Sequence, residues 1–437
     1  MGNSRIARIA LGSACAIGLG RFAYGLVLPA MTADLHWSLG TAATLSTANG
    51  AGYLVGALMT PPVTARWGTV TTFRLGLAIC AASIGATAAA GALPAGGAAY
   101  AVLLLTRAVT GLAGALVFVT GAVLAPGGTF FAGTGVGIAI SGAVLPPLLA
   151  PDAGRWPLAW LFLAVAAAGC TAAAWTAAAP TATAATDRPD LMEPARRPDQ
   201  TKEPDRPSSP DQPKSLGQPS SPGQLGTANR TDSANRTSSS DVAMRTVLRA
   251  VGESARPVAR GARLWRVAVA YALFAAGYLA YLTFLSSYLQ SRTASAGLVA
   301  GVWALLGLAV LATPAVQRPA VPLAVLAIAA IVAWLWPQPV VVAASALAFG
   351  SSFMAVPAAV TGIARGKAAH GRVTTVVARL TVVFAAGQMA GPWLAGLVAD
   401  RTTPAAALVW TAALCAAAAV VAARGAGAPA GEVRQPA

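Results

Sequence analysis

Long runs of apolar residues, separated by short polar segments, dominate the chain. A helix needs about 20 apolar residues to cross the hydrocarbon core of a bilayer. Twelve runs approach that length, and they lie at residues 6–31, 41–61, 71–93, 98–124, 130–150, 157–179, 266–289, 297–316, 319–336, 339–363, 374–399 and 405–423. The two runs within 297–336 fit either a helical hairpin or one long tilted span. The pattern predicts an all-α membrane protein with twelve transmembrane helices.

One long polar segment, 181–264, interrupts this pattern after the sixth run. It is rich in Pro, Ser, Asp, Gln and Arg and has few apolar residues before about 242. Such a composition cannot bury enough apolar surface to offset the entropy lost on folding, which predicts disorder. We therefore expect an N-terminal six-helix bundle over 1–180, a disordered linker over 181–264, and a C-terminal six-helix bundle with a short tail over 265–437. The end of the linker, from 242, is typical of a basic amphipathic helix on a membrane surface.

Composition supports the membrane assignment and excludes a nucleic-acid partner. The 437 residues are 56% hydrophobic and only 10% charged, against about 25% in soluble domains. The net charge of +16 would be compatible with nucleic-acid binding only if the cations were clustered. Instead, the polar segment holds 13 basic and 10 acidic residues, and the other cations are scattered, mostly at the ends of apolar runs.

The distribution of these cations predicts the topology, because loops rich in Arg and Lys stay in the cytoplasm. With a cytoplasmic N-terminus, the outer loops receive only Arg155, Arg292 and Arg401, and the other loop cations fall inside. We therefore expect both termini and the linker to be cytoplasmic, and the protein to lie in a bacterial inner membrane.

Charges inside the spans are the most informative candidates for function. Outside the linker, the acidic residues are Asp34, Asp152, Asp400 and Glu432, all near span ends or in the tail. Three arginines, in contrast, lie inside spans, and these are Arg21, Arg107 and Arg379. A cation at the membrane centre is costly and should face the bundle interior, where it needs an anion, backbone carbonyls or water. A bound anionic substrate, gripped bidentately by a guanidinium, would meet that need.

A structural alternative exists for each of these arginines. Arg21 and Arg107 could bind carbonyls of unwound helix and hold helices in register, and Asp34 could reach inward. Arg379 could extend towards the cytoplasmic surface.

Weaker polar candidates complete the predicted binding site. Asn49 and Tyr53 are four residues apart and share a face of the second span, and Gln388 lies in the middle of the eleventh. The seventh span carries an aromatic stripe on one face, in which Tyr278 lies near the middle, and its members are Tyr271, Phe274, Tyr278, Tyr281 and Tyr288. Such a stripe is typical either of packing or of a ligand surface.

Enzyme signatures are missing from the sequence. It has two histidines and neither an HExxH nor a GxxxxGK[ST] motif, which excludes the common zinc-hydrolase and ATP-binding sites. We expect no enzymatic activity, no metal and no cofactor, and a small-molecule substrate as the partner of a protein that works as a monomer in the bilayer.

The spans and their motifs resemble the major facilitator superfamily. "RAVTGLAGA" at 107–115 is similar to its fourth-span pattern and matches at Arg107, Gly111 and Gly114. "GLGRFAYGLVLPAM" at 18–31, "ANGAGYLVGAL" at 48–58 and "GQMAGPWLAGLVAD" at 387–400 are similar to the YbfB/YjiJ-like branch. The resemblance covers both membrane halves but not 181–264.

This resemblance implies two pseudo-symmetric bundles, with a substrate site between them and transport by alternating access. Gly391 and Pro392 would serve close packing and kinking of the eleventh span. The superfamily's loop after the second span usually reads Asp-Arg-x-Gly, but here Ala65 precedes Arg66 and Gly68. The missing acid puts the usual charge contacts of the cytoplasmic side in doubt. A related "GLVADR" at 396–401 lies instead after the eleventh span.

These observations predict a secondary or facilitative transporter of a small organic anion. Because no carboxylate lies in mid-span, we expect exchange, facilitated diffusion or coupling to the membrane potential ahead of carboxylate-based proton symport. Two alternatives remain open. One is a multidrug exporter of hydrophobic compounds, and the other is a receptor or scaffold that does not transport and whose linker recruits a partner.

Overall fold

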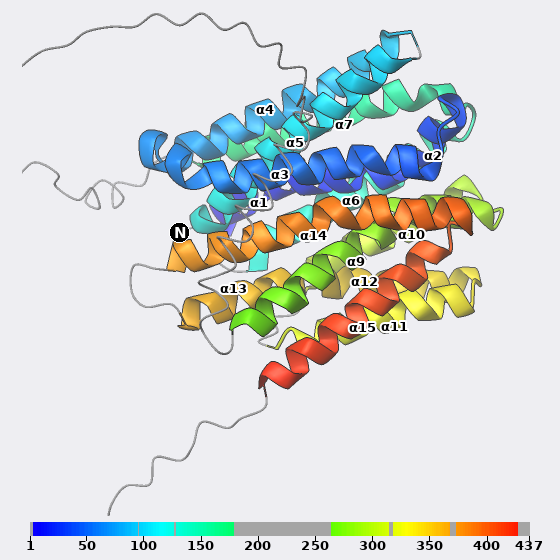
Figure 1. Cartoon of the computed structure of the whole chain (residues 1–437). Helices are drawn as coiled ribbons and strands as arrows, with labels where there is room; N and C mark the ends of the chain where they lie inside the picture. Colours follow the sequence, from blue (N-terminus) through cyan, green and yellow to red (C-terminus); the bar gives the residue numbers. More distant parts are fainter. Residues whose placement is uncertain are drawn as a thin grey trace, which may run out of the picture. The chain divides into compact units, whose positions relative to one another are not determined.

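The computed structural model describes residues 3–94, 96–125, 128–178, 264–313, 318–367 and 373–426. All regular elements in these residues are helical (Figure 1). In the N-terminal half they are α1 (Asn3–Ser13), the π-helix η1 (Ala14–Phe22), α2 (Tyr24–Asp34), α3 (Leu39–Trp67), α4 (Thr69–Ala89), η2 (Ala90–Ala92), α5 (Gly97–Leu124), α6 (Gly128–Leu149), η3 (Ala153–Arg155) and α7 (Trp156–Ala177). In the C-terminal half they are α9 (Leu264–Ser291), α10 (Ala296–Leu311), α11 (Ala320–Leu335), α12 (Pro339–Phe353), α13 (Ala355–Lys367), α14 (Val373–Arg401) and α15 (Ala406–Ala426).

These helices confirm the all-α fold with twelve spans. The first span is α1, η1 and α2 together, and the tenth is α12 followed by α13. The region 297–336 forms two helices, α10 and α11, as the hairpin alternative requires, and each has 16 residues. Nine helices in the described part are long and apolar enough to cross a membrane. Of the predicted linker, only Leu264, the first residue of α9, is described, so the expected disorder and surface helix lie outside the described residues.

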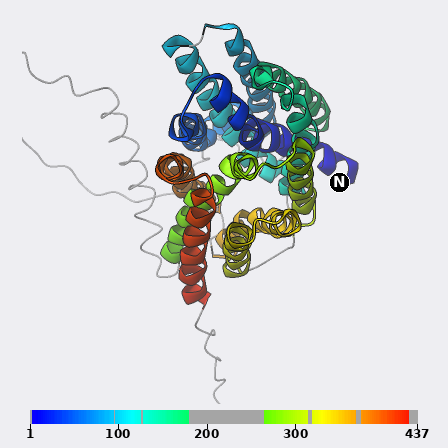
Figure 2. The ribbon, with the colours of Figure 1, turned by 90° about the vertical axis from the view of Figure 1, so that its right-hand side faces the viewer.

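The helices of the two halves lie in two groups side by side (Figure 2). Contacts between the groups come mainly from three pairs of helices, which are α3 with α14, α6 with α10, and α2 with α9. Glycine allows the third pair to approach closely, since a Cβ at Gly25 would lie only 2.0 Å from the carbonyl oxygen of Leu282. Small residues are the usual means of close helix packing in lipid.

Local sequence signals place the helix ends. Ser38 begins α3 by accepting a hydrogen bond from the Thr41 N–H at 3.1 Å. Gly68 ends α3 at a φ of +77°, a conformation that favours glycine, and the polypeptide turns directly into α4. The turn is therefore shorter than the segment 62–70 that the predicted spans leave between them.

Large apolar side chains also cover the outer surface. Leu105, Val165 and Val340 are 64%, 66% and 80% exposed, respectively. Helices with apolar side chains on their outer faces are suited to contact with lipid.

Candidate functional site

Arg21 lies in a widened turn of the first span. In η1 the Ala23 N–H donates to the Gly18 carbonyl at 3.0 Å, five residues back instead of four. The Arg21 side chain is 6% exposed, and its Nε and Nη2 atoms have no hydrogen-bond partner. Its guanidinium carbon lies 5.0 Å from the centre of the Tyr53 ring. Buried donors without partners are costly, and π-turns often mark functional sites, so Arg21 is the leading candidate for a binding group.

Arg107, in the middle of α5, has a different environment. Its Nη1 donates to the Gly20 carbonyl at 2.7 Å, which ties α5 to η1. Its guanidinium carbon lies 5.3 Å from the Tyr24 ring centre and 5.0 Å from that of Trp160. Cation–π contacts of this kind stabilise a buried guanidinium. Arg107 therefore makes the carbonyl contact that the structural alternative describes.

Asn49 and Tyr53 project from α3 towards these arginines. The Asn49 Nδ2 donates to the Arg107 carbonyl at 3.1 Å, while its Oδ1 is buried without a partner. Tyr53 is 2% exposed and supplies the ring beneath Arg21. The four-residue spacing thus places both side chains on the face that meets the arginines.

The C-terminal half contributes Tyr278 and Gln388, which are hydrogen-bonded to each other. The Gln388 Nε2 donates to the Tyr278 hydroxyl, and the Gln388 Oε1 is buried without a partner. Tyr278 stacks on Phe274 at 4.5 Å between ring centres and 14° between planes. Phe353 and Phe384 lie nearly parallel to the Tyr278 ring, each 6.0 Å away.

These side chains enclose two small cavities. We define the polar chamber, of about 10 Å³, as the one whose polar lining is Arg21, Ser46, Asn49, Arg107 and Thr283. The aromatic chamber, of about 20 Å³, includes Arg21, Tyr53, Phe274, Tyr278, Phe353, Phe384 and Gln388 in its lining. Arg21 lines both chambers, and both chambers are lined by residues of both halves.

An interrupted helix from each half borders the aromatic chamber. The first span changes from π to α geometry at Ala23. In the tenth span α12 ends at Phe353, and Pro357 has no N–H to bond the Phe353 carbonyl. Interrupted helices at the interface of two repeats are a common setting for transporter binding sites.

The described acidic side chains lie far along the spans from this site. Asp34 accepts a hydrogen bond from the Trp156 Nε1 at 2.8 Å, at the end of α2. Asp152 accepts from the Gly154 N–H at 2.9 Å, and Asp400 binds at the start of α3. We call this end of the molecule the Asp34 end and the opposite one the Arg66 end. In the described part, no carboxylate lines either chamber.

The residues predicted to have a structural or gating role differ in how crowded they are. A Cβ at Gly111 would lie 1.9 Å from the Asn49 carbonyl oxygen, and one at Gly391 would lie 2.2 Å from that of Ala276. Gly114 is less crowded, because its nearest neighbour would be the Ala16 carbonyl oxygen at 3.6 Å. Arg66, by contrast, is exposed in the last turn of α3, beside the turn at Gly68.

Pro392 lies inside α14 and removes the N–H that would bond the Gln388 carbonyl. The sequence predicts a kink in the eleventh span at this point, and the proline lies one turn beyond the chamber residue Gln388. The roles of Pro392 and of the packing glycines in gating stay predictions.

Asp400 makes a contact that sequence reasoning missed. Its Oδ1 and Oδ2 accept hydrogen bonds from the N–H groups of Leu39 and Gly40, both at 2.8 Å. A carboxylate at a helix N-terminus satisfies free N–H groups and the helix dipole. The "GLVADR" segment therefore joins α14 of one half to α3 of the other at the Asp34 end. In the sequence, only the unusual position of the "GLVADR" segment after the eleventh span pointed to this contact.

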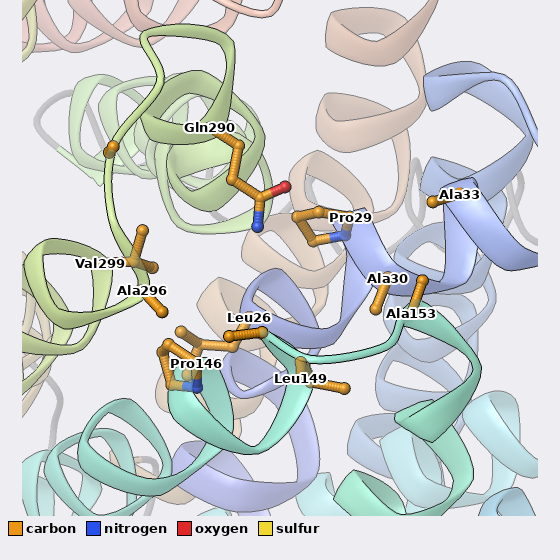
Figure 3. Close-up of a pocket in the computed structure, with 12 residues that line it drawn as sticks. Leu26, Pro29, Ala30, Ala33, Pro146, Leu149, Ala153, Gln290, Ala296 and Val299 are labelled. Carbon is orange, nitrogen blue, oxygen red and sulfur yellow. The ribbon is translucent and has the colours of Figure 1, made fainter.

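A larger cavity of about 360 Å³ opens at the Asp34 end, between α2, α6, α9 and α10 (Figure 3). Its walls are small or apolar, with Pro29 and Pro146 on one half, and Gln290 projects towards it from the other. It has no charged lining residue. Gly25 and Leu282 line the polar chamber and not this cavity, and their close contact lies between the two spaces. The cavity is therefore separate from the charged site.

The structure also adds chamber residues that the sequence did not single out. Phe118, Phe353 and Phe384 come from three different spans, so no periodicity within one span connects them to the Tyr278 stripe. The stripe itself divides, because Tyr281 stacks on Phe349 at 3.9 Å and Tyr288 donates to the Ala333 carbonyl at 2.6 Å. Arg379 is half-buried in α14 and lines neither chamber.

Comparison with known proteins supports the fold and identifies a family. The family model described as "Uncharacterised MFS-type transporter YbfB" matches residues 13–201 and 243–426. Among solved structures, the chain is similar to the nucleoside transporter NupG, with a TM-score of 0.58 and 11% identity over 97% of this chain and 98% of that one. It is also similar to a D-xylose-proton symporter, with a TM-score of 0.61 and 11% identity over 95% of each chain. No curated protein sequence matches at a significant level.

Proposed function

The chain belongs to the family of YbfB-type MFS transporters, and we propose that it moves a small organic anion that binds to Arg21. It is a multi-pass membrane transporter and not an enzyme. The observation that carries the proposal is the Arg21 guanidinium, which is buried between the halves with Nε and Nη2 unpartnered. In the described part no carboxylate lies beside it, so an anionic group on the substrate is the natural counter-charge.

The placement of Arg21 suits alternating access. Its chambers are lined by both halves, so a ligand held there is released from one half whenever the halves rock apart. Asn49 and Tyr53 on one half, and Tyr278 and Gln388 on the other, are the side chains that we assign to substrate contact. Arg107 fixes the position of the Gly20 backbone next to Arg21.

The test is thermal unfolding of the detergent-purified protein with carboxylates, phosphates, sulfonates, amino acids and lipophilic cations. A bound ligand raises the melting temperature by mass action. We expect at least one anion to stabilise the wild type and to have no effect on Arg21→Gln. The Arg66→Gln variant is the matched control, because Arg66 is exposed at the far end of α3. If no anion stabilises the wild type, or if the anion also stabilises Arg21→Gln fully, the proposal is wrong.

We further propose that transport does not depend on a membrane carboxylate. Asp34 is held by Trp156 at the end of its span, and the chambers offer only uncharged polar groups besides the arginines. Asp34→Asn should therefore retain uptake into proteoliposomes with an unchanged pH profile. Loss of uptake with a shifted pH profile would favour carboxylate-based proton symport instead.

The distribution of charge supports our proposal for the orientation in the membrane. Arg5 and Arg74 at the Arg66 end bind the carbonyls of Ala177 and Trp175, near the C-terminus of α7. The described Asp34 end carries fewer cations, which are Arg155, Arg292 and Arg401. Under the positive-inside rule the Arg66 end is cytoplasmic in a bacterial inner membrane. A cysteine placed at residue 155 should then react with an impermeant thiol reagent added outside cells.

A second candidate function is export of hydrophobic compounds. The aromatic lining of one chamber favours it, because stacked rings accept many apolar ligands. Lipophilic cations that stabilise the protein, together with anions that do not, would support this function over the first.

A further inference from the structure

The geometry points to a single-ring aromatic carboxylate with a ring hydroxyl group as the substrate of the Arg21 site. This inference rests on the proposed function and specifies its substrate class. It combines three features of the two chambers that no single residue provides, namely a free guanidinium edge, a set of nearly parallel rings and a free amide oxygen.

The free edge of Arg21 fits a carboxylate. Nε and Nη2 are on the same edge of the planar guanidinium, and both lack a partner. Two parallel N–H groups are the geometry that binds both oxygens of one carboxylate. Ser46 and Thr283, one from each half, are further hydroxyl groups in the polar chamber next to Arg21.

The aromatic chamber fits a flat ring better than an aliphatic chain. The rings of Phe274, Tyr278 and Phe384 lie within 23° of one another, with centres 4.5 to 6.0 Å apart. Nearly parallel aromatic surfaces favour stacking with another aromatic ring beyond the effect of buried area alone. Because Arg21 lines both chambers, a carboxylate attached directly to a ring places its two parts in adjoining spaces.

Gln388 favours a ligand ring that carries a hydrogen-bond donor. Its amide nitrogen is engaged by Tyr278, while its Oε1 is buried in the aromatic chamber without a partner. A buried carbonyl oxygen that stays unpaired is unfavourable, and a donor on the ligand would pair with it while the bond to Tyr278 stays in place. A ring hydroxyl group is such a donor, and it also fits a site that is otherwise apolar.

The size of the chambers limits the ligand. The chambers measure only about 10 and 20 Å³, because the side chains around them are closely packed. Binding therefore requires the halves to separate slightly. Among aromatic ligands, a single ring needs the smallest such movement. Fused rings or a ring joined to a sugar would need a much larger one, which favours a single-ring ligand.

The experiment measures dissociation constants of the full-length protein in detergent by isothermal titration calorimetry. The probes are 3- and 4-hydroxybenzoate, benzoate, cyclohexanecarboxylate and 4-hydroxybenzamide. We expect the better hydroxybenzoate to bind about tenfold more tightly than benzoate, as one hydrogen bond predicts. Benzoate should in turn bind more tightly than cyclohexanecarboxylate, and the uncharged amide should bind about a hundredfold more weakly than its acid.

Two variants assign these preferences to residues. Gln388→Leu should make benzoate and the hydroxybenzoates bind equally well. Phe384→Leu should abolish the preference for benzoate over cyclohexanecarboxylate. Phe73→Leu removes a fully buried ring that lies outside the chambers, and it should change neither preference. Unaltered circular dichroism and melting temperatures near that of Phe73→Leu show that the first two variants are folded.

The outcomes separate this inference from the proposed function. If aliphatic anions bind as tightly as aromatic ones but depend on Arg21, the anion proposal stands and the aromatic substrate class is wrong. If benzoate and both hydroxybenzoates bind equally to the wild type, the assignment of Gln388 is wrong. If no carboxylate binds, the substrate class is wrong, and the anion proposal then stands only if a phosphate or sulfonate stabilises the wild type but not Arg21→Gln.

Discussion

Arg21 and Arg107 have the same side chain at similar depth in neighbouring spans, yet their surroundings differ. Arg107 donates to the Gly20 carbonyl and lies against the rings of Tyr24 and Trp160, all within the N-terminal half. Arg21 lies against Tyr53, keeps two donors unpartnered, and faces chambers that both halves line. Arg107 also lines the polar chamber and keeps its Nε unpartnered, but its own bundle holds it in place. Arg21 instead has one whole guanidinium edge, Nε and Nη2, free to bind something between the bundles.

The difference teaches where a costly buried charge is compensated. For Arg107 most of the cost of a cation in the membrane is offset by one backbone carbonyl and two aromatic rings of the same bundle, and only Nε lacks a partner. For Arg21, compensation is incomplete until an anion arrives. We therefore expect removal of Arg107 to affect stability and removal of Arg21 to affect ligand binding.

The largest expected effect is the loss of stability when Arg107 is removed. Arg107→Ala removes the bond to Gly20 and two cation–π contacts, and should lower the free energy of unfolding by about 3 kcal/mol. Unfolding in mixed micelles of detergent and SDS measures it. A loss as small as that of Arg21→Ala, which we expect to stay below about 1 kcal/mol, would remove the distinction between the two arginines.

The next effect tests why the functional position holds an arginine. Arg21→Lys keeps the charge but loses the two-pronged edge, and should weaken binding of the best carboxylate by about tenfold. Calorimetric titration compares the two proteins. Equal affinity would mean that charge alone attracts the substrate and that the guanidinium geometry does not matter.

Asp400 extends the comparison to a negative charge. Its carboxylate, in the C-terminal half, accepts hydrogen bonds from backbone N–H groups of the N-terminal half. Asp400→Asn keeps one acceptor oxygen for the two N–H groups at the start of α3 and removes the charge. It should lower the free energy of unfolding by about 1 kcal/mol. Asp152→Asn is the matched control, because Asp152 binds only within its own turn. Melting temperatures of the two variants give the answer, and equal shifts would show that the α3–α14 contact adds nothing.

The smallest expected effect concerns the ring beneath Arg21. Tyr53→Phe keeps the ring, so we expect changes below about 0.5 kcal/mol in stability and in carboxylate binding. Tyr53→Leu, which removes the ring, should lower stability and carboxylate affinity by more than Tyr53→Phe does. If Tyr53→Phe abolishes carboxylate binding, then binding depends on the Tyr53 hydroxyl group and not on the face of its ring.

The sequence predicts the fold well because apolar length and charge bias act over whole spans. The twelve helices could be predicted from local patterns, whereas the predicted spans left 62–70 between two helices that only Gly68 separates. The contrast between Arg21 and Arg107 could not, because their partners, Tyr53 on one side and Trp160 on the other, belong to different spans. Phe384 and the bond from Asp400 to Gly40 depend in the same way on which helices become neighbours.

The most direct test compares Arg21→Gln with Arg107→Gln in one thermal-unfolding experiment, with and without a stabilising carboxylate. We predict that Arg21→Gln melts near the wild-type temperature and gains nothing from the ligand. Arg107→Gln should melt well below it but still be stabilised by the ligand, after correction for its lower starting point. The reverse result, with Arg107→Gln insensitive to the ligand and Arg21→Gln responsive, would contradict the central claim that Arg21 holds the substrate.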